Sequence, residues 1–167
     1  LIMATAGKDL SGYDAGSVPS GAGLRLGVVV SDWNAEITGA LRDGAVETLL
    51  RHGVKLASLV EVHVPGSYEL PLGALTIMEQ QQLDGAICIG SVVRGETPHF
   101  EYVCQATSQG IMDLNLRLGR PVIFCVLTDN TIEQARDRSG GRHGNKGVEC
   151  AVALLRMCDL QRRHART

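Results

Sequence analysis

Four short apolar runs, separated by stretches of helical periodicity, constrain the fold of this chain more than any other feature of its sequence. The runs are Leu24–Val30, Leu56–Val64, Gly85–Ile89 and Pro121–Leu127. Runs of this length and polarity are typical of strands that are covered on both faces. Strands that alternate with helices form parallel sheets with right-handed crossovers. The sequence therefore predicts an α/β fold, with a four-stranded parallel sheet inside a three-layer αβα sandwich.

The stretches between the runs predict the helices. Apolar residues from Ile37 to Leu49 recur on one helical face, which stops at His52-Gly53. The preceding loop, Ser31–Asn34, offers side chains that can cap this helix. Further helices are expected over Leu70–Gln82, over Tyr102–Leu118, in a short segment through Arg138, and after the glycine-rich turn Gly140–Gly147.

The chain divides into an arm and one domain. Residues 1–23 show no usable period and predict an extended N-terminal arm, either loose or laid across a neighbouring subunit. Leu1 and Ile2 stand before Met3, where we expect the natural chain to start. Because 167 residues fit a single core and no internal repeat is evident, residues 24–167 are expected to form one domain.

Composition excludes several classes of partner and cofactor. Sixteen Lys and Arg against eighteen Asp and Glu leave a net charge of −2 with no obvious basic face, which argues against nucleic acid. Five cysteines without a CxxC pair favour a reducing, cytoplasmic setting over a disulfide framework. No apolar stretch is long enough to span a bilayer, so no membrane partner is expected. The five histidines lack metal-site spacing, and neither a metal nor a cofactor is expected.

The segment Gly90–Phe100 is the strongest candidate for chemistry. It follows the third apolar run and precedes a helix, so it is expected to be a loop at the carboxyl edge of the sheet, where ligands bind in open parallel sheets. Arg94, Glu96 and Thr97 offer an anion site, and His99 can exchange protons near neutral pH. Thr97 and His99 also have ordinary interpretations, because Thr97 can cap the helix and His99 can be structural or simply exposed.

Three residues outside that segment can complete a site. Arg138, at the end of the short helix, competes with Arg94 as the clamp for a phosphate. Trp33, in a loop at the sheet edge, can stack on a flat heterocycle or can anchor packing. Phe124 lies inside a predicted strand, where a core role is expected in the absence of other context.

Four motifs together closely resemble the lumazine synthase family of riboflavin biosynthesis. The resemblance runs from about Leu24 to Leu160, in order and with matching spacing. It implies a flavodoxin-like fold and a transferase that condenses 5-amino-6-(D-ribitylamino)uracil with L-3,4-dihydroxy-2-butanone 4-phosphate. The products are 6,7-dimethyl-8-ribityllumazine, phosphate and water, and no cofactor is needed. The motifs are Gly90–Phe100, Val64–Pro71, Leu127-Thr128 followed by Thr131–Ala135, and Gly144–Gly147.

The resemblance also implies a role for each matching residue. His99 would be the proton carrier, and Phe124 would close the pocket from an adjacent subunit. The other residues would bind the pyrimidine with its ribityl chain, or the phosphate. The pyrimidine and ribityl set is Trp33, Ser67, Tyr68, Glu69, Ser91, Val92, Val93 and Phe124, with Lys146 as an accessory contact, and the phosphate set is Glu96, Thr97 and Arg138. The chain departs mildly from the family at Trp33, at Ser67-Tyr68 and at Asp129-Asn130, where many relatives have other residues.

Family members assemble as pentamers, and many build an icosahedral shell from them. The resemblance therefore implies small-molecule substrates, a homopentamer with active sites at subunit interfaces, and riboflavin synthase as a partner. The uninserted length of the turn Gly140–Gly147 favours the icosahedral shell. In such an assembly the N-terminal arm would strap one subunit to the next.

Two other classes of function fit part of the pattern. A non-catalytic flavin- or lumazine-binding shell protein of the same fold would need Trp33 and Phe124 but not His99 and Arg138. The presence of both latter residues favours the enzyme. The architecture alone also fits a flavodoxin-like phosphate-binding module that acts on another small substrate.

Overall fold

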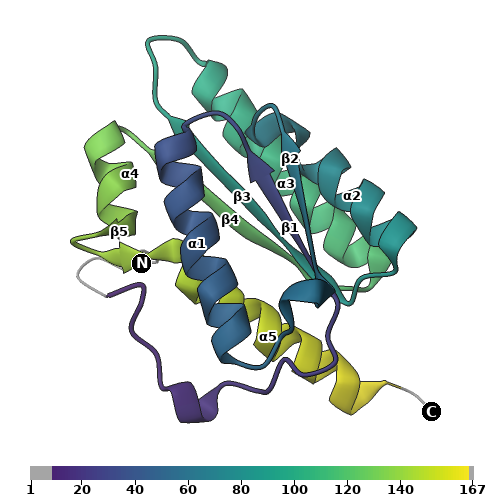
Figure 1. The fold of residues 1–167 in the computed structure, drawn as a ribbon. Helices are drawn as coiled ribbons and strands as arrows, with labels where there is room; N and C mark the ends of the chain where they lie inside the picture. The colour runs from purple at the N-terminus through teal and green to yellow at the C-terminus, as the bar shows by residue number, and fades with distance from the viewer. Residues whose placement is uncertain (1–8, 166–167) are drawn as a thin grey trace.

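A computed structural model describes residues 9–165 of the chain, and its centre is a four-stranded parallel sheet in the order β2-β1-β3-β4 (Figure 1). The strands are β1 (Leu26–Ser31), β2 (Leu59–Val64), β3 (Gly85–Val93) and β4 (Val122–Asp129). All three strand pairs are parallel. The predicted four-stranded parallel sheet is confirmed.

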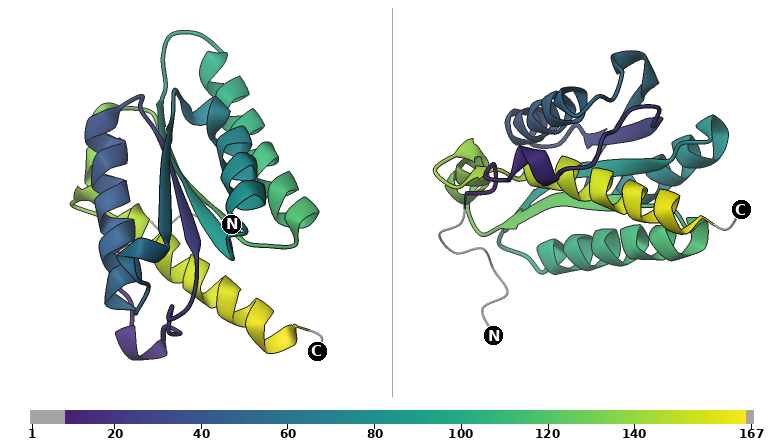
Figure 2. Two further views of the ribbon diagram at one scale, coloured as in Figure 1. Left: turned by 45° about the vertical axis from the view of Figure 1, so that its right-hand side comes forward. Right: turned by 90° about the horizontal axis from the view of Figure 1, so that it is seen from below.

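Helices cover both faces of the sheet (Figure 2). On one face lie α1 (Ala35–Arg51) and α5 (Lys146–His164), and on the other lie α2 (Leu70–Gln81) and α3 (His99–Leu118). The short helix α4 (Ile132–Arg138) follows β4. The molecule is thus the three-layer αβα sandwich that the sequence predicted. No helix within residues 9–165 is long and apolar enough to cross a membrane.

Two hydrophobic cores, one on each face, explain why the strands are apolar without alternation. In β1, Val28 and Val30 are buried with α1 and α5, whereas Val29 between them is buried with α2. Successive side chains of a strand point to opposite faces, so a strand covered twice needs apolar residues at every position. At about 25 cal/mol for each Å² of buried apolar surface, both cores stabilise the sheet.

Strands β3 and β4 both run further than the sequence predicted, β3 to Val93 and β4 to Asp129. β3 continues through Ser91–Val93 because it stays paired with β4 as far as the Val93 and Asp129 register. The N–H of Arg94 then donates to the carbonyl of Asp129 at 2.9 Å. The segment predicted as one loop is therefore strand up to Val93, and only residues 94–98 connect it to α3. That helix begins at His99, one turn before the predicted start.

Other boundaries differ by less. Leu56–Ser58 forms a single 3-10 turn, η2, closed by a bond of 2.8 Å from the Ser58 N–H to the Lys55 carbonyl, so the second strand begins only at Leu59. The first strand begins at Leu26, not at Leu24. The glycine-rich turn contains a small antiparallel pair, β5 (Ser139–Gly141) and β6 (Gly144–Asn145).

The described part of the N-terminal arm lies against its own chain. Leu10 is buried, and its N–H donates to the His143 carbonyl at 2.8 Å. The Gly21 N–H donates to the His52 carbonyl at 2.8 Å, and a 3-10 turn, η1 (Ala15–Ser17), lies between these anchors. Residues 9–23 are therefore held along their length rather than loose. Residues 1–8 of the predicted arm lie outside the described residues.

Candidate active site

A pocket of about 720 Å³ lies at the carboxyl edge of the sheet, where the loops after β1, β2 and β3 meet the start of α3. Most of the site residues predicted from the sequence converge there. Those that line the pocket are Trp33, Ser67, Tyr68, Glu69, Ser91, Val92, Val93, Thr97 and His99.

Sequence reasoning missed six other residues of the pocket wall. Four of them lie inside the motifs that carried the family resemblance, so the motifs could have identified them. Asn34 directly follows Trp33, and Val103 lies one helical turn after His99, but neither position carries a signal of its own. The six residues are Asn34, Pro65, Gly66, Gly95, Phe100 and Val103.

Backbone hydrogen bonds hold the Trp33 loop beside the loop after β2. The Asp32 N–H donates to the Val64 carbonyl at 2.9 Å, and the Trp33 N–H donates to the Pro65 carbonyl at 3.3 Å. The indole itself is 73% exposed. The interpretation of Trp33 as a packing anchor is therefore wrong for the described chain, and its aromatic face is free to stack on a ligand.

Asn34 ties the same loop to β3. Its backbone is left-handed, with φ of 59°, a conformation that Asn tolerates better than most residues. In this position its Nδ2 donates to the Ser91 carbonyl at 3.0 Å. Asn34 precedes α1 but makes no side-chain cap, so the predicted capping role of this loop is wrong. The side chain instead joins two walls of the pocket.

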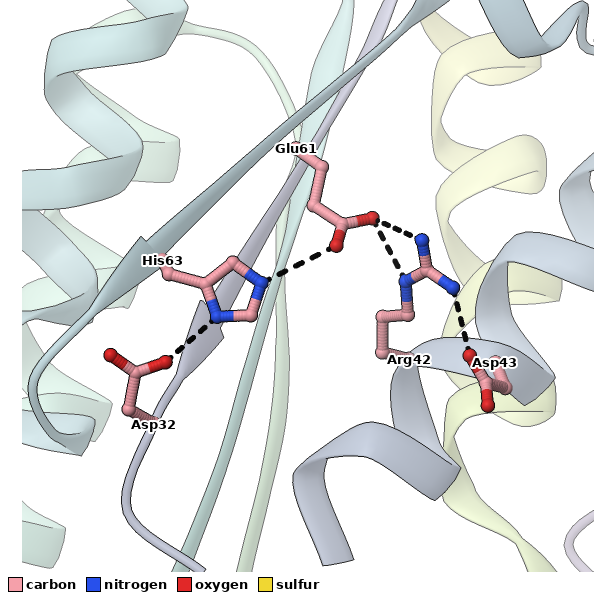
Figure 3. Close-up of polar contacts among 5 residues, drawn as sticks. All are labelled: Asp32, Arg42, Asp43, Glu61 and His63. Atoms are coloured by element: carbon pink, nitrogen blue, oxygen red, sulfur yellow. Dashed lines mark hydrogen bonds and ion pairs between the residues drawn. The ribbon is translucent and has the colours of Figure 1, made fainter. Parts of the chain in front are cut away.

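A surface chain of charged groups reinforces the Trp33 loop from outside (Figure 3). His63 Nδ1 lies 2.8 Å from Asp32 Oδ1, and its Nε2 lies 3.4 Å from Glu61 Oε1. Arg42 of α1 pairs with the same Glu61 at 2.7 Å and with Asp43 at 2.8 Å. The hydrogen bond to Asp32 is the main cause that raises the pKa of His63. The network links β2 and α1 to the residue that precedes Trp33.

Ser67 lies in the pocket wall, packed between Gly90 of β3 and Thr107 of α3. It belongs to a 3-10 turn, η3 (Ser67–Glu69), and its carbonyl accepts a hydrogen bond of 3.1 Å from the buried Thr107 hydroxyl. Gly90 faces it from β3, and a Cβ there would overlap the Ser67 hydroxyl. Glycine at position 90 is therefore required for the close approach of η3 to the sheet.

The contacts of Arg94, in the loop from β3 to α3, distinguish it from Arg138 as a candidate phosphate clamp. Arg94 makes an ion pair with Glu101, its guanidinium lies 4.3 Å from the centre of the Phe100 ring, and its Nε donates to Asn130 Oδ1 at 2.9 Å. Its side chain is thus folded onto α3 and occupied, which weakens its candidacy as a phosphate clamp. The N-cap of α3 is Pro98, and no side chain caps the helix there. The ordinary interpretation of Thr97, as a cap of this helix, is therefore wrong.

Four predicted site residues lie outside the pocket. Glu96 is exposed in the loop between two residues that line it. The others come from β4 and from the two helices that follow it. Phe124 is half-buried in β4, and Lys146 begins α5 and pairs with Glu149 at 2.6 Å. Arg138 ends α4, where its Nη1 donates to the Gln134 carbonyl at 3.1 Å.

The chemical groups that line the pocket indicate the kind of ligand that it can bind. The pocket presents an aromatic face, hydroxyls, a carboxylate and an imidazole, which suit a polar heterocycle and proton transfer. Arg138 and Lys146 are cations on the helices α4 and α5 that follow β4, and Phe124 is a second ring that packs on the α2 and α3 face of β4. Within residues 9–165, no three His, Cys, Asp or Glu side chains are grouped closely enough to hold a metal ion.

Comparison with known proteins gives one consistent answer. A family model described as 6,7-dimethyl-8-ribityllumazine synthase matches residues 23–162. A protein of that name from Porphyromonas gingivalis is 51% identical over 160 residues, covering 96% of this chain and 99% of the relative. Proteins of the same name from Phocaeicola vulgatus and Christiangramia forsetii are both 48% identical, over 165 and 161 residues, and cover 98% and 96% of those relatives. The alignments cover 99% and 96% of this chain.

Proposed function

The chain belongs to the 6,7-dimethyl-8-ribityllumazine synthase family, and from this premise we propose that the pocket beside Trp33 and His99 is half of its active site. The enzyme is a transferase of riboflavin biosynthesis. It condenses 5-amino-6-(D-ribitylamino)uracil with L-3,4-dihydroxy-2-butanone 4-phosphate to give 6,7-dimethyl-8-ribityllumazine, phosphate and water. The carrying observation is that nine residues predicted for this site line a single pocket. The comparisons give no support to the alternative of a non-catalytic shell protein.

The pyrimidine binds against Trp33 in this proposal. The exposed indole supplies a flat stacking surface, and the loop that carries it is fixed by the bonds to Val64, Pro65 and Ser91. Ser67, Tyr68 and Glu69 of η3 hold the ring and the ribityl hydroxyls. Ser91, Val92 and Val93 form the wall opposite this turn, so the ring is held between two rigid elements.

The phosphate binds where α3 begins. The unpaired backbone N–H groups and the partial positive charge of that helix N-terminus favour an anion, and Thr97 adds a hydroxyl. Glu96 contributes to the same loop. Because Arg94 is engaged by Glu101, Phe100 and Asn130, whereas the ion pair of Arg138 is a longer one of 3.7 Å, Arg138 is the better candidate for the bidentate cation that completes the site.

His99 is the proton carrier in this proposal. The 5-amino nitrogen attacks the ketone of the four-carbon substrate, and water leaves to form an imine. Phosphate then leaves together with a proton from the adjacent hydroxyl-bearing carbon, and the resulting enol tautomerises to a ketone with a new methyl group. The ribitylamino nitrogen attacks this ketone and closes the second ring with loss of water. Each step moves protons at near-neutral pH, which suits an imidazole at the pocket rim. Holding two reactants in contact supplies the larger share of the acceleration.

Phe124, Lys146 and Arg138 reach the pocket of a neighbouring copy. Two complementary half-sites on different parts of one chain favour a head-to-tail contact, which closes into a ring when every copy repeats it. The resemblance makes that ring a pentamer, and the short turn before Asn145 favours an icosahedral shell of pentamers. We also propose riboflavin synthase as a partner, from the resemblance, and the cytoplasm as the location, because all five cysteines are free thiols.

Mixed assemblies test the function and the shared site together. Purified His99→Ala and Arg138→Ala proteins are each assayed with both substrates by the appearance of lumazine absorbance. The two variants are then produced together, so that their subunits mix. If each site takes residue 99 from one copy and residue 138 from the next, about a quarter of the sites regain both groups and activity rises above the mean of the parents.

The enzymatic function, the shared site and the ring would each be overturned by a different result. No lumazine from the wild-type protein would overturn the enzymatic function itself. Activity of the mixture equal to the mean of the parents would overturn the shared site while leaving the reaction in place. Sedimentation of the same samples measures the assembly, and a mass below that of a pentamer under several buffers would overturn the proposed ring.

A further inference from the structure

Asp129, the last residue of β4, is a buried carboxyl group beside Arg138. Its side chain is only 8% exposed, and its Oδ1 lies 3.7 Å from Arg138 Nη1. Its Oδ2 is buried without a hydrogen-bond partner among the described residues. Buried carboxylate oxygens are normally satisfied by several donors, so this group is unusual for a residue with no assigned role.

Burial and the arginine act on Asp129 in opposite directions. Burial raises the pKa of the Asp129 carboxyl, and the nearby Arg138 guanidinium lowers it, with burial the larger cause. Arg138 is the charged group that offsets the cost of the buried carboxylate. Its own side chain is 39% exposed, so the guanidinium faces the carboxylate on one side and is open on another.

Two other cations that follow β3 and β4 in the chain, Arg94 and Lys146, are already paired. Arg94 gives its backbone N–H to the Asp129 carbonyl, but its guanidinium is engaged by Glu101 and Asn130. Lys146 pairs with Glu149. The register partner of Asp129 on β3 is Val93, which is apolar.

We propose that Asp129 is a positioning residue that sets the phosphate affinity of Arg138, as the resident anion with which the substrate phosphate competes for the guanidinium. The proposal rests on the assignment of Arg138 to the phosphate half-site. When a phosphate approaches, the carboxylate either cedes the arginine or takes up a proton. After phosphate leaves the reacting carbon, the carboxylate recovers the arginine and promotes release.

The variant Asp129→Asn keeps the shape of the side chain and removes its charge. It is expected to lower the KM for the butanone phosphate about three- to tenfold, the size expected from removing one unit charge that is screened as in water, because the guanidinium is partly exposed. The KM for the pyrimidine is expected to stay unchanged. Inorganic phosphate, a product, is expected to inhibit the variant at correspondingly lower concentrations. A defect confined to folding would not improve the affinity for one substrate alone.

Glu133→Gln is the matched control. Glu133 lies on the same α4 helix and its side chain is 73% exposed, so the substitution removes an equal charge without touching the buried pair. Its kinetics are expected to match the wild type. An Asp129→Asn protein with an unchanged or raised KM for the phosphorylated substrate overturns the proposal. An equal fall in KM for Glu133→Gln overturns it too, since the effect would then be one of net charge.

Sulfate binding gives a second measurement, because sulfate keeps its charge while the protein titrates. Because burial raises the pKa of Asp129, its protonation as pH falls is expected to strengthen sulfate binding in the wild type, and Asp129→Asn is expected to show a shallower dependence on pH. Equal slopes overturn the proposal. If Arg138→Ala leaves phosphate inhibition unchanged, the assignment of Arg138 fails instead, which distinguishes that failure from a failure at Asp129.

Discussion

The two proposed half-sites of this chain differ in how much of their geometry is already complete. The pocket at Trp33 is bounded by paired backbone, and its loops are tied to one another by hydrogen bonds. The region around Arg138 has a cation at a helix end, a buried carboxyl with an unsatisfied oxygen, and no pocket shared with Trp33. The pocket at Trp33 is already formed for a rigid ring, whereas Arg138 pairs loosely with the chain's own Asp129 and would exchange it for a phosphate only when one binds. The comparison suggests that heterocycle binding and phosphate binding are separable properties, and substitutions can test that separation.

The largest expected effect is at His99. His99→Ala should lower kcat about a hundredfold, because one proton carrier is lost while both substrates are still oriented. The KM values of both substrates should change little. Steady-state kinetics with each substrate varied in turn measure this, and complete loss of turnover would mean that orientation contributes less than we infer.

Arg138→Ala should separate the two halves most clearly. Loss of a charge-assisted contact of about 1.5–3 kcal/mol predicts a rise of about thirtyfold in the KM for the butanone phosphate. The KM for the pyrimidine should stay close to that of the wild type. Arg94→Ala is the matched comparison, and a larger effect there than at position 138 would reverse the assignment of the phosphate clamp.

Gly90→Ala should disturb the pocket half alone. The added methyl group would overlap the Ser67 hydroxyl, so η3 must move, at a cost of about 1–3 kcal/mol in the free energy of unfolding. Thermal or urea unfolding measures the cost, and the KM for the pyrimidine should rise as well. Gly39→Ala is the control, because a Cβ there meets nothing within 4 Å. Equal stability of the two variants would show that η3 is not fixed as described.

The smallest expected effect is a pH dependence at His63. Because the folded pKa of His63 is raised above its unfolded value, chiefly by Asp32, its stabilisation is full below the unfolded pKa and is lost as pH rises through the folded pKa. The ring is 55% exposed, so solvent limits the effect to a few tenths of a kcal/mol. His63→Gln should therefore be slightly less stable than the wild type at low pH and equal to it at high pH. A stability difference that grows with pH would contradict this sign.

The fold was predictable because four apolar runs and the spacing between them specify a doubly covered parallel sheet. The end of β3 was not, since Gly90 and Ser91 are typical of loops and only pairing with β4 keeps them in a strand. The residue types alone left Arg94 and Arg138 equivalent as phosphate clamps, and only the family resemblance favoured Arg138. Contacts of Arg94 with Phe100 and Glu101, formed only in three dimensions, distinguish them. The contribution of Arg138 to a neighbouring copy stays a prediction, because it depends on the assembly and one sequence suggests the assembly only through its resemblance to a family.

The hydrogen bonds from Asp32 to Val64 and from Trp33 to Pro65 continue the pairing of β1 and β2 past the ends of both strands. The rim of the pocket is therefore held by the same kind of backbone hydrogen bonds as the sheet itself. A ligand that stacks on Trp33 therefore does not have to freeze a mobile loop, and little conformational entropy is lost on binding. Differences in affinity among flat heterocycles should consequently appear mainly in the enthalpy of binding, and the rate of association should be limited by encounter rather than by loop closure.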